Sequence, residues 1–278
     1  MKAKMIMKYS VFCLIGFFIC AVNAVPCYKS FDNILLIINY NHPHYESIPF
    51  IKELYGPYFA NIVFYGTQKH SDVYDLPLYK GYFSYLSIAD AMERFPDYEG
   101  YFFVHDDCII NPWRLLRLDR NKIWIPKTFW ITDEASTDIG TPINVKNPHF
   151  PSWCWWGSEW GYWPTRIAFE ELPDEAKQLL ESSWGEDNVV GSYADVVYIP
   201  ALFKERYIEL ARIFGKNKVF LEIALPTIIA CLSSKEEYEF LIGQLWGYAT
   251  EKDYNHPIKL SYPEKRAYIK EIFTTIGF

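Results

Sequence analysis

Two adjacent carboxylates, Asp106 and Asp107, end the stretch YFFVHDD at residues 101–107. Like charges repel each other, and a buried carboxylate without a partner is costly. Carboxylate oxygens are the ligands that Mg²⁺ and Mn²⁺ prefer, usually together with waters and substrate phosphates. The pair therefore predicts a divalent-cation site that also holds a diphosphate. The alternative is that the two carboxylates cap the next turn and meet Arg114 or Arg117, and spacing alone does not separate these interpretations.

Short apolar runs and amphipathic segments alternate along the chain around this pair. We expect strands at 33–41, 61–66, 100–107 and 194–200, helices at 47–59, 84–96, 171–184 and 201–215, and an apolar helix or strand at 220–232. This alternation predicts a single α/β domain over residues 25–278, with a mostly parallel central sheet and helices on both faces. Ligands of such sheets bind beyond the carboxyl ends of the strands, where Asp106, Asp107 and Asn39 fall.

Residues 126–165 interrupt this alternation with prolines, glycines and many aromatic residues, so we expect a long loop there. The tryptophans of this segment are Trp153, Trp155, Trp156, Trp160 and Trp163. Sugars pack their C–H faces on aromatic rings, and an indole N–H can bond a hydroxyl. Trp155 and Trp156 are therefore candidates for substrate binding. The alternative is that the rings hold the loop on the domain, and we expect most of them to do so.

The N-terminus has the features of a secretory signal peptide, which we place at residues 1–24. Lys2, Lys4 and Lys8 precede and flank a short apolar run that ends in small residues at Ala24. The run is shorter than the roughly 20 residues of a membrane span, and an uncleaved signal anchor is the alternative. We expect a secreted or Golgi-lumen protein of the secretory pathway, with no stable membrane span after cleavage. A net charge of −7 without basic runs argues against a nucleic-acid partner.

Four cysteines follow the predicted signal: Cys27, Cys108, Cys154 and Cys231. An even number of cysteines in a secretory chain permits two disulfides, with three possible pairings. We expect Cys108, directly after the aspartate pair, to form one half of a disulfide.

Two segments carry a resemblance to a known family. The stretch GYFFVHDDCIINPWRLLRLDRNKIW at 100–124 resembles the C-terminal domain of the plant STELLO proteins, Golgi proteins classed as glycosyltransferases. The stretch ADVVYIPALFKERYIELARIFGKNKVFLEIALP at 194–226 resembles a later part of that domain. The first segment shares Asp106, Asp107, Asn111, Trp113, Leu115, Leu116, Asp119, Lys122 and Trp124 with the family. One position differs, because the family has an acidic residue before the aspartate pair where this chain has His105.

The resemblance implies a GT-A-like fold and a glycosyltransferase that uses a nucleotide-sugar donor, a glycan or other hydroxyl acceptor, and Mn²⁺ or Mg²⁺. In this interpretation Asp106 and Asp107 hold the metal. His256 resembles the late histidine that completes the metal site in some GT-A enzymes, and the alternative is a solvent-facing loop histidine. Asp106 and Asn39 would contact the nucleotide.

An inverting transferase also needs a base that deprotonates the acceptor hydroxyl. Glu222 falls where many GT-A enzymes place a catalytic carboxylate, and Glu159 is a second candidate. Asp133 and Glu134 also qualify, and the sequence does not rank them. Asp195, which opens a predicted strand, would contact the donor or the acceptor. The alternative for Glu222 is a helix surface, and for Asp195 a turn.

Two other functions compete with the transferase. A metal-dependent hydrolase would use His42 and His44, whose spacing suits zinc, together with Asp107. A polar strand-to-helix loop is the simpler account of these histidines. A non-catalytic secreted carbohydrate-binding protein would keep the tryptophans and need no metal, and His105 in place of an acid favours it.

Overall fold

The computed structural model describes residues 30–129, 140–149, 155–245 and 252–256. The predicted signal at 1–24, Cys27, Trp153 and Cys154 lie outside these residues, as do Asp133 and Glu134. Within them, no helix is long and apolar enough to cross a membrane.

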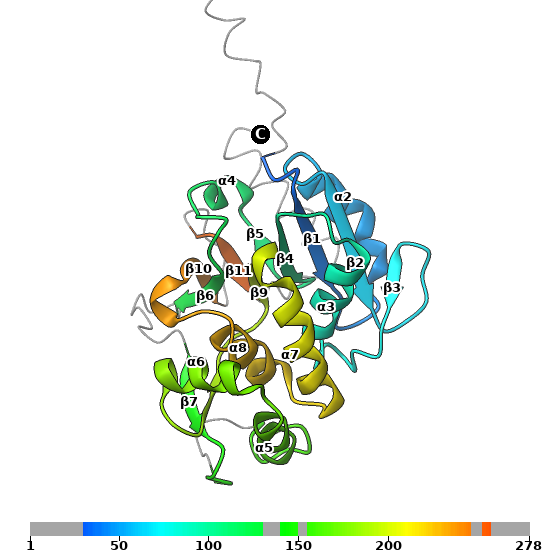
Figure 1. Ribbon diagram of the computed structural model, residues 1–278. Coiled ribbons are helices and arrows are strands. Elements are labelled where there is room, and N and C mark those ends of the chain that lie inside the picture. Colours follow the sequence, from blue (N-terminus) through cyan, green and yellow to red (C-terminus); the bar gives the residue numbers. More distant parts are fainter. Residues whose placement is uncertain (1–29, 130–139, 150–154, 246–251, 257–278) are drawn as a thin grey trace, which may run out of the picture.

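A nine-stranded sheet forms the centre of the molecule, in the order β3-β2-β1-β4-β9-β6-β10-β11-β5 (Figure 1). Its strands are β1 (Ile34–Asn39), β2 (Asn61–Gly66), β3 (Val73–Asp75), β4 (Gly100–His105), β5 (Ile109–Ile110), β6 (Trp124–Phe129), β9 (Val196–Pro200), β10 (Glu239–Leu245) and β11 (Tyr254–His256). Neighbouring strands are parallel except at β9, which runs against β4 and β6, and at β5, which runs against β11. A separate antiparallel pair joins β7 (Thr141–Asn144) and β8 (Asn188–Gly191).

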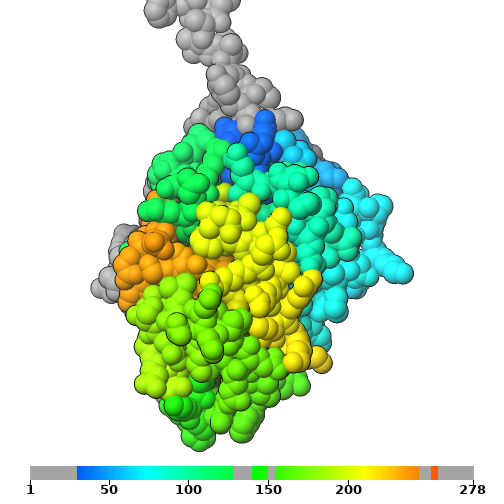
Figure 2. Space-filling model, viewed as in Figure 1, coloured from blue at the N-terminus to red at the C-terminus, as the bar shows by residue number. Residues whose placement is uncertain are grey.

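Helices cover both faces of the sheet. The described helices are α2 (Ile48–Tyr55), α3 (Tyr85–Arg94), α4 (Pro112–Leu115), α5 (Tyr162–Glu170), α6 (Asp174–Trp184), α7 (Lys204–Lys216) and α8 (Leu221–Ala230). Along β1, Leu35 and Ile37 pack with α3, α7 and α8, whereas Leu36 and Ile38 pack with α2 and α4. This alternation is the two-residue period of a strand that is buried on both sides. Figure 2 shows α7, in yellow, on the surface between the teal α3 and the green α5 and α6.

The predicted α/β fold is therefore confirmed, with a mostly parallel sheet, helices on both faces and an arrangement that fits the GT-A-like fold. The apolar segment at 220–232 is a helix, α8, whose residues are almost all buried. A helix that is apolar on every side must lie in the interior, and its local sequence resembles that of a buried strand.

The loop predicted at 126–165 was only partly right. Its first residues belong to β6, which pairs in parallel with β10, and residues 141–144 form β7. Neither β10 nor β11 was predicted. The partner of β6 lies more than 100 residues further along the chain, so no local pattern reveals the pairing.

The predicted disulfide at Cys108 stays a prediction, because two of its possible partners, Cys27 and Cys154, lie outside the described residues. Cys108 and Cys231, the two cysteines that the structure describes, are both buried and are not joined to each other. The Cys108 sulfur lies 4.0 Å from Asp107 Oδ1 and 4.0 Å from the Asp195 carbonyl oxygen. Burial raises the pKa of the Cys231 thiol to about 12, so this side chain behaves as a small apolar residue.

Candidate functional site

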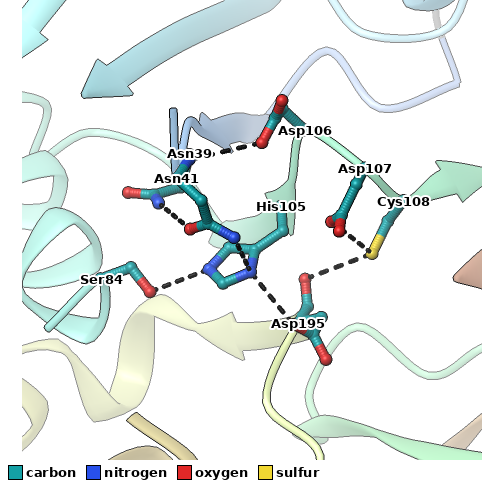
Figure 3. Close-up of polar contacts among 8 residues, drawn as sticks. All are labelled: Asn39, Asn41, Ser84, His105, Asp106, Asp107, Cys108 and Asp195. Atoms are coloured by element: carbon teal, nitrogen blue, oxygen red, sulfur yellow. Dashed lines mark hydrogen bonds and ion pairs between the residues drawn. The ribbon is translucent and has the colours of Figure 1, made fainter. Parts of the chain in front are cut away.

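Three strands meet at the carboxyl end of β4 (Figure 3). Strands β1 and β4 are parallel neighbours, and Asn39 is paired with His105 at their ends. The next strand, β9, runs the other way and is preceded by Asp195, whose carbonyl oxygen accepts a hydrogen bond of 2.9 Å from the His105 backbone N–H. The strand order reverses between β1 and β4, so this is a topological switch point, where open α/β sheets bind ligands.

His105 is held through both of its ring nitrogens. The side chain is 3% exposed, Nδ1 lies 3.0 Å from Asp195 Oδ1, and Nε2 lies 2.9 Å from Ser84 Oγ. Ser84 is the N-cap residue of α3, yet its hydroxyl makes no capping bond to the helix. The hydroxyl bonds His105, so the start of α3 fixes the ring beside the switch point. Asn41 Nδ2 also approaches His105 Nδ1, at 3.3 Å.

Asn41 connects His105 with Asp106. Its backbone N–H lies 3.4 Å from Asp106 Oδ1, and its side-chain oxygen lies 3.5 Å from Asn39 Nδ2. The close neighbour of that side chain is Gly81, whose φ is +84°, and a Cβ there would stand 1.7 Å from Asn41 Oδ1. A glycine is therefore required at position 81 both by backbone conformation and by space.

Asn39, predicted to contact the nucleotide, is fully buried beneath Asn41. Its Oδ1 is buried and has no hydrogen-bond partner among the described residues. Asn39 therefore reaches the site through Asn41, which sequence reasoning missed. The available signal was the position of Asn41 two residues beyond the end of β1, in the region where ligands of such sheets bind.

Asp106 and Asp107 are both half-buried and follow β4 directly. Arg114 and Arg117, the partners considered for them in the alternative interpretation, bind Asp253 at 3.3 and 2.5 Å. The described residues contain no group of three or more His, Cys, Asp or Glu side chains that could hold a metal. Among the described residues, the aspartate pair can therefore supply only part of the coordination shell of a metal ion.

Strand β11 lies beside the segment that follows the aspartate pair. Tyr254 is paired with Ile110 and Asn255 with Ile109, in antiparallel register. Continuing that register places the backbone of His256 across from Cys108, one residue beyond Asp107. His256, the predicted metal ligand, thus lies on the strand next to the aspartate pair, and its side chain is not among those that the structure describes.

Tyr193 lies near Glu222 and Asp195, the other two carboxylates predicted for the site. Its pKa is raised, first by burial of the hydroxyl and then by the negative charges of Glu222 and Asp195. Glu222 is in the first turn of α8, and its backbone oxygen accepts a hydrogen bond of 3.0 Å from the Ser192 N–H. Glu222 and Asp195 therefore lie in one neighbourhood, which includes His105 through its contact with Asp195.

The two predicted substrate-binding tryptophans differ in exposure. Trp156 is 1% exposed, and its N–H donates to the Asn147 carbonyl oxygen at 2.9 Å. Both the ring and its polar atom are engaged in the fold, so this placement does not fit the predicted substrate contact. Trp155 is half-buried and stacks on Phe220, with ring centroids 4.6 Å apart.

Glu159, the second candidate base, lies on a separate groove of about 890 Å³ beyond the ends of β2 and β3. Trp160 and the half-exposed Tyr79 also line this groove, with ring centroids 5.4 Å apart. Its polar lining also includes Thr67, the exposed lysines Lys80 and Lys218, and a second carboxylate, Asp75. The backbone of Tyr79, Lys80 and Lys218 has positive φ, a strained conformation that is concentrated at functional sites.

The predicted zinc site of the rival hydrolase does not form. The rings of His42 and His44 are 6.2 Å apart and exposed, and His44 approaches Glu46 at 3.7 Å. They form no metal-binding group with Asp107. A polar loop between β1 and α2 accounts for both histidines.

Comparison with known proteins finds plant relatives. No protein-family model matches the chain. It is 22% identical over 223 residues to STELLO1 and 22% identical over 230 residues to STELLO2, both of Arabidopsis thaliana and both described as probable glycosyltransferases. Each alignment covers 80% of this chain. The chain resembles the STELLO proteins.

This result confirms the resemblance inferred from segments 100–124 and 194–226. The chain spans 27% of the length of STELLO1 and 28% of that of STELLO2, so most of each relative has no counterpart in it. A solved structure, of a glycosyltransferase involved in the glycosylation of the major capsid of PBCV-1, aligns with a TM-score of 0.41 and 11% identity. That alignment covers 86% of this chain and 99% of the other.

Proposed function

We propose that the chain is a glycosyltransferase that binds a nucleotide-sugar at the carboxyl ends of β1 and β4 and transfers the sugar to a hydroxyl acceptor. The observation that carries this proposal is the meeting of Asn41, His105, Asp106, Asp107 and Asp195 at one topological switch point. The resemblance to the STELLO proteins supports it.

Asp106 and Asp107 would hold a Mn²⁺ or Mg²⁺ ion. These metals are often bound by one or two carboxylates, with substrate phosphates supplying further ligands, and the half-buried pair fits that kind of site. His256, on the neighbouring strand β11, is the third residue that we assign to it. A bound divalent cation would supply positive charge to the diphosphate leaving group.

His105 has a supporting role in this proposal. Its contacts with Ser84 and Asp195 keep the ring buried beside the aspartate pair, so it organises the site without contacting substrate. Because Asp195 is already bound to His105, we assign the acceptor's base to Glu222, across Tyr193 from Asp195. The Tyr193 hydroxyl is protonated at neutral pH, as an ordinary tyrosine hydroxyl is, so it can donate a hydrogen bond to a substrate oxygen.

The groove beyond β2 and β3 would receive the nucleoside. Its exposed ring, Tyr79, offers a surface for base stacking, and Lys80 offers a hydrogen-bond donor and a positive charge. Gly81, which follows the groove residue Lys80 in the chain, lies against Asn41 of the switch point. Glu159 belongs to this groove, so we no longer assign it the role of base.

The experiment is a nucleotide-sugar panel monitored by thermal shift, with and without Mn²⁺. A ligand that binds the folded state raises the melting temperature through mass action. We expect one nucleotide diphosphate and its sugars to stabilise the chain, and EDTA to abolish the effect. Stabilisation by none of them would end the transferase proposal.

A non-catalytic carbohydrate-binding protein is the second candidate. The observation in its favour is that the described residues lack a complete set of metal ligands. This candidate predicts stabilisation by a free saccharide, with no response to Mn²⁺ or to a nucleotide. For either function we propose that the chain enters the secretory pathway through residues 1–24.

A further inference from the structure

The half-buried Trp155 differs from the buried tryptophans in what its indole N–H meets. Trp124 and Trp156 donate theirs to backbone carbonyl oxygens, at 2.7 and 2.9 Å. Trp155 Nε1 has no acceptor among the described residues, yet it is not one of the buried polar atoms that lack a partner. The atom is therefore open to solvent, where a ligand oxygen can accept its hydrogen bond.

The ring of Trp155 is held firmly in place. One face stacks on Phe220 with an interplanar angle of 20°, and Tyr82 meets the ring in a T-shaped contact with centroids 5.5 Å apart. Because Trp155 is only half-buried, these contacts leave part of the ring accessible. A rigid indole with an accessible face and an open N–H offers contact area at a low cost in conformational entropy.

On one side, Trp155 is connected to the donor site. Its neighbour Tyr82 follows Gly81 directly in the chain, and Gly81 lies against the Asn41 side chain. The Asn41 backbone N–H in turn lies 3.4 Å from Asp106 Oδ1 (Figure 3). The segment that carries Tyr82 therefore joins the ring to the place where the nucleotide-sugar is proposed to bind.

On the other side, Trp155 is connected to the proposed base. Phe220, on which it stacks, is the N-cap residue of α8, and Glu222 is in the first turn of that helix. The Tyr82 carbonyl oxygen accepts a hydrogen bond of 2.8 Å from the Leu221 N–H, which ties the two sides together. A molecule that rests on Trp155 therefore lies between the donor site and the carboxylate assigned to deprotonate the acceptor.

We propose that Trp155 is the platform on which the acceptor rests and that the acceptor is a saccharide, an inference that rests on the function proposed above. A pyranose ring packs its C–H face on the indole, and a neighbouring hydroxyl accepts the Nε1–H. A serine or threonine side chain, or a lipid hydroxyl, has no flat apolar face to match the ring. Trp160, which also contacts Tyr82, lines the groove assigned to the nucleoside.

The transfer then balances at the acceptor hydroxyl. The hydroxyl loses its proton to Glu222, and its oxygen forms a bond to the anomeric carbon of the donor. The bond from that carbon to the diphosphate breaks, and the nucleoside diphosphate leaves with the electron pair.

Saturation-transfer NMR and titration calorimetry of the full chain, with Mn²⁺ and with UDP or GDP, test the platform. The probes are cellotriose, chitotriose, galactotriose and mannotriose, together with an octapeptide rich in serine and threonine. We expect at least one trisaccharide to bind, with the strongest saturation on the C–H protons of one face of one ring.

Trp155→Leu removes the flat ring and should weaken the binding of that trisaccharide at least about tenfold, or about 1.4 kcal/mol. Trp155→Phe keeps a smaller ring and removes the N–H, and we expect a loss of about threefold. It also serves as the second variant if the leucine does not fold, which circular dichroism shows. Trp163→Leu is the matched control and should leave the affinity unchanged, because Trp163 is an indole on α5 that is 65% exposed.

Unchanged trisaccharide affinity in both Trp155 variants would overturn the platform, as would binding of the peptide alone or of no probe at all. Binding of UDP or GDP in the same samples would then leave the transferase proposal standing. The opposite result is a chain that binds no nucleotide but binds a trisaccharide, with that binding lost in Trp155→Leu. It would uphold the saccharide platform and reject the transferase.

Discussion

Asp253→Asn is the substitution for which the structure predicts the largest loss of stability at a single polar group. The Asp253 side chain is fully buried and accepts three hydrogen bonds, from Arg114 at 3.3 Å, Arg117 at 2.5 Å and the Ile242 backbone N–H at 2.7 Å. Its own backbone oxygen accepts the Asn111 N–H. These contacts hold β11 against the segment that follows the aspartate pair.

Asparagine keeps the shape of the side chain but removes the charge and one acceptor. Hydrogen bonds to charged groups contribute about 1.5–3 kcal/mol each, and breaking a buried ion pair costs about 3–5 kcal/mol. The arginines are 34% and 43% exposed, so solvent reduces this figure, and we expect a loss of about 2–4 kcal/mol. For a chain of this size each kcal/mol corresponds to roughly 2–4 °C in melting temperature.

Urea unfolding followed by tryptophan fluorescence measures this loss. Asp72→Asn is the control, because Asp72 pairs with Lys52 at an exposed position and its removal should leave the unfolding midpoint almost unchanged. Because β11 also carries His256, Asp253→Asn should weaken Mn²⁺-dependent nucleotide binding at temperatures where the variant is folded. An unfolding free energy within 0.5 kcal/mol of the wild type, roughly the size of a surface substitution, would refute the reasoning.

Three further substitutions or treatments test other parts of the structure. His105→Ala removes the ring that bonds Asp195 and should lower the free energy of unfolding by roughly 1–3 kcal/mol; a neutral result in urea unfolding would contradict the network. Gly81→Ala puts a Cβ against Asn41 at a position with φ of +84°. It should lower the free energy of unfolding by on the order of 1–3 kcal/mol, and so lower the melting temperature by several degrees. Gly157→Ala is the control and should not lower it, because the space around Gly157 is open. Cys231 in the folded protein should resist iodoacetamide at pH 8 and should react once urea unfolds the chain. With a pKa of about 12, only roughly one Cys231 thiol in ten thousand is ionised at pH 8. Rapid labelling of Cys231 in the folded protein, detected from peptide masses, would contradict its burial.

The raised pKa of Cys231 also gives a pH dependence with a definite sign. The folded state favours the protonated thiol, whose pKa is about 12 against an ordinary value of 9.0. Between these values the unfolded chain binds fewer protons than the folded chain, so stability falls as the pH rises. Cys231→Ala should reduce the steepness of this alkaline loss in urea titrations, and an unchanged slope would show that other groups cause it.

The aspartate pair and its strand could be predicted from the sequence because their signals are local. A continuous apolar run followed by Asp106 and Asp107 identifies a buried parallel strand and its carboxyl end. The rule that ligands lie beyond such ends then placed Asn39 in the same region, as the pairing of β1 with β4 confirms.

Other parts of the site depend on tertiary packing that no local pattern encodes. The contact between Ser84 and His105 requires the start of α3 to lie against the end of β4, and a serine before a helix is ordinarily a cap. Strand β10 is defined by its pairing with β6. The sequence could not say which tryptophans are structural, because stacking on a sugar and packing in a core need the same rings, and burial is what places Trp156 in the core.

The most direct test of the central claim is the affinity of the chain for a nucleotide diphosphate with and without Mn²⁺, measured by calorimetry on the wild type, Asp107→Asn and Asp97→Asn. Asp97 is an exposed carboxylate before β4, at the opposite end of the strand from the site. We predict Mn²⁺-dependent binding that weakens at least about tenfold in Asp107→Asn, or about 1.4 kcal/mol, and is unchanged in Asp97→Asn. Equal affinity in all three folded proteins, or binding that ignores Mn²⁺, would contradict the assignment of the aspartate pair to a metal–diphosphate site.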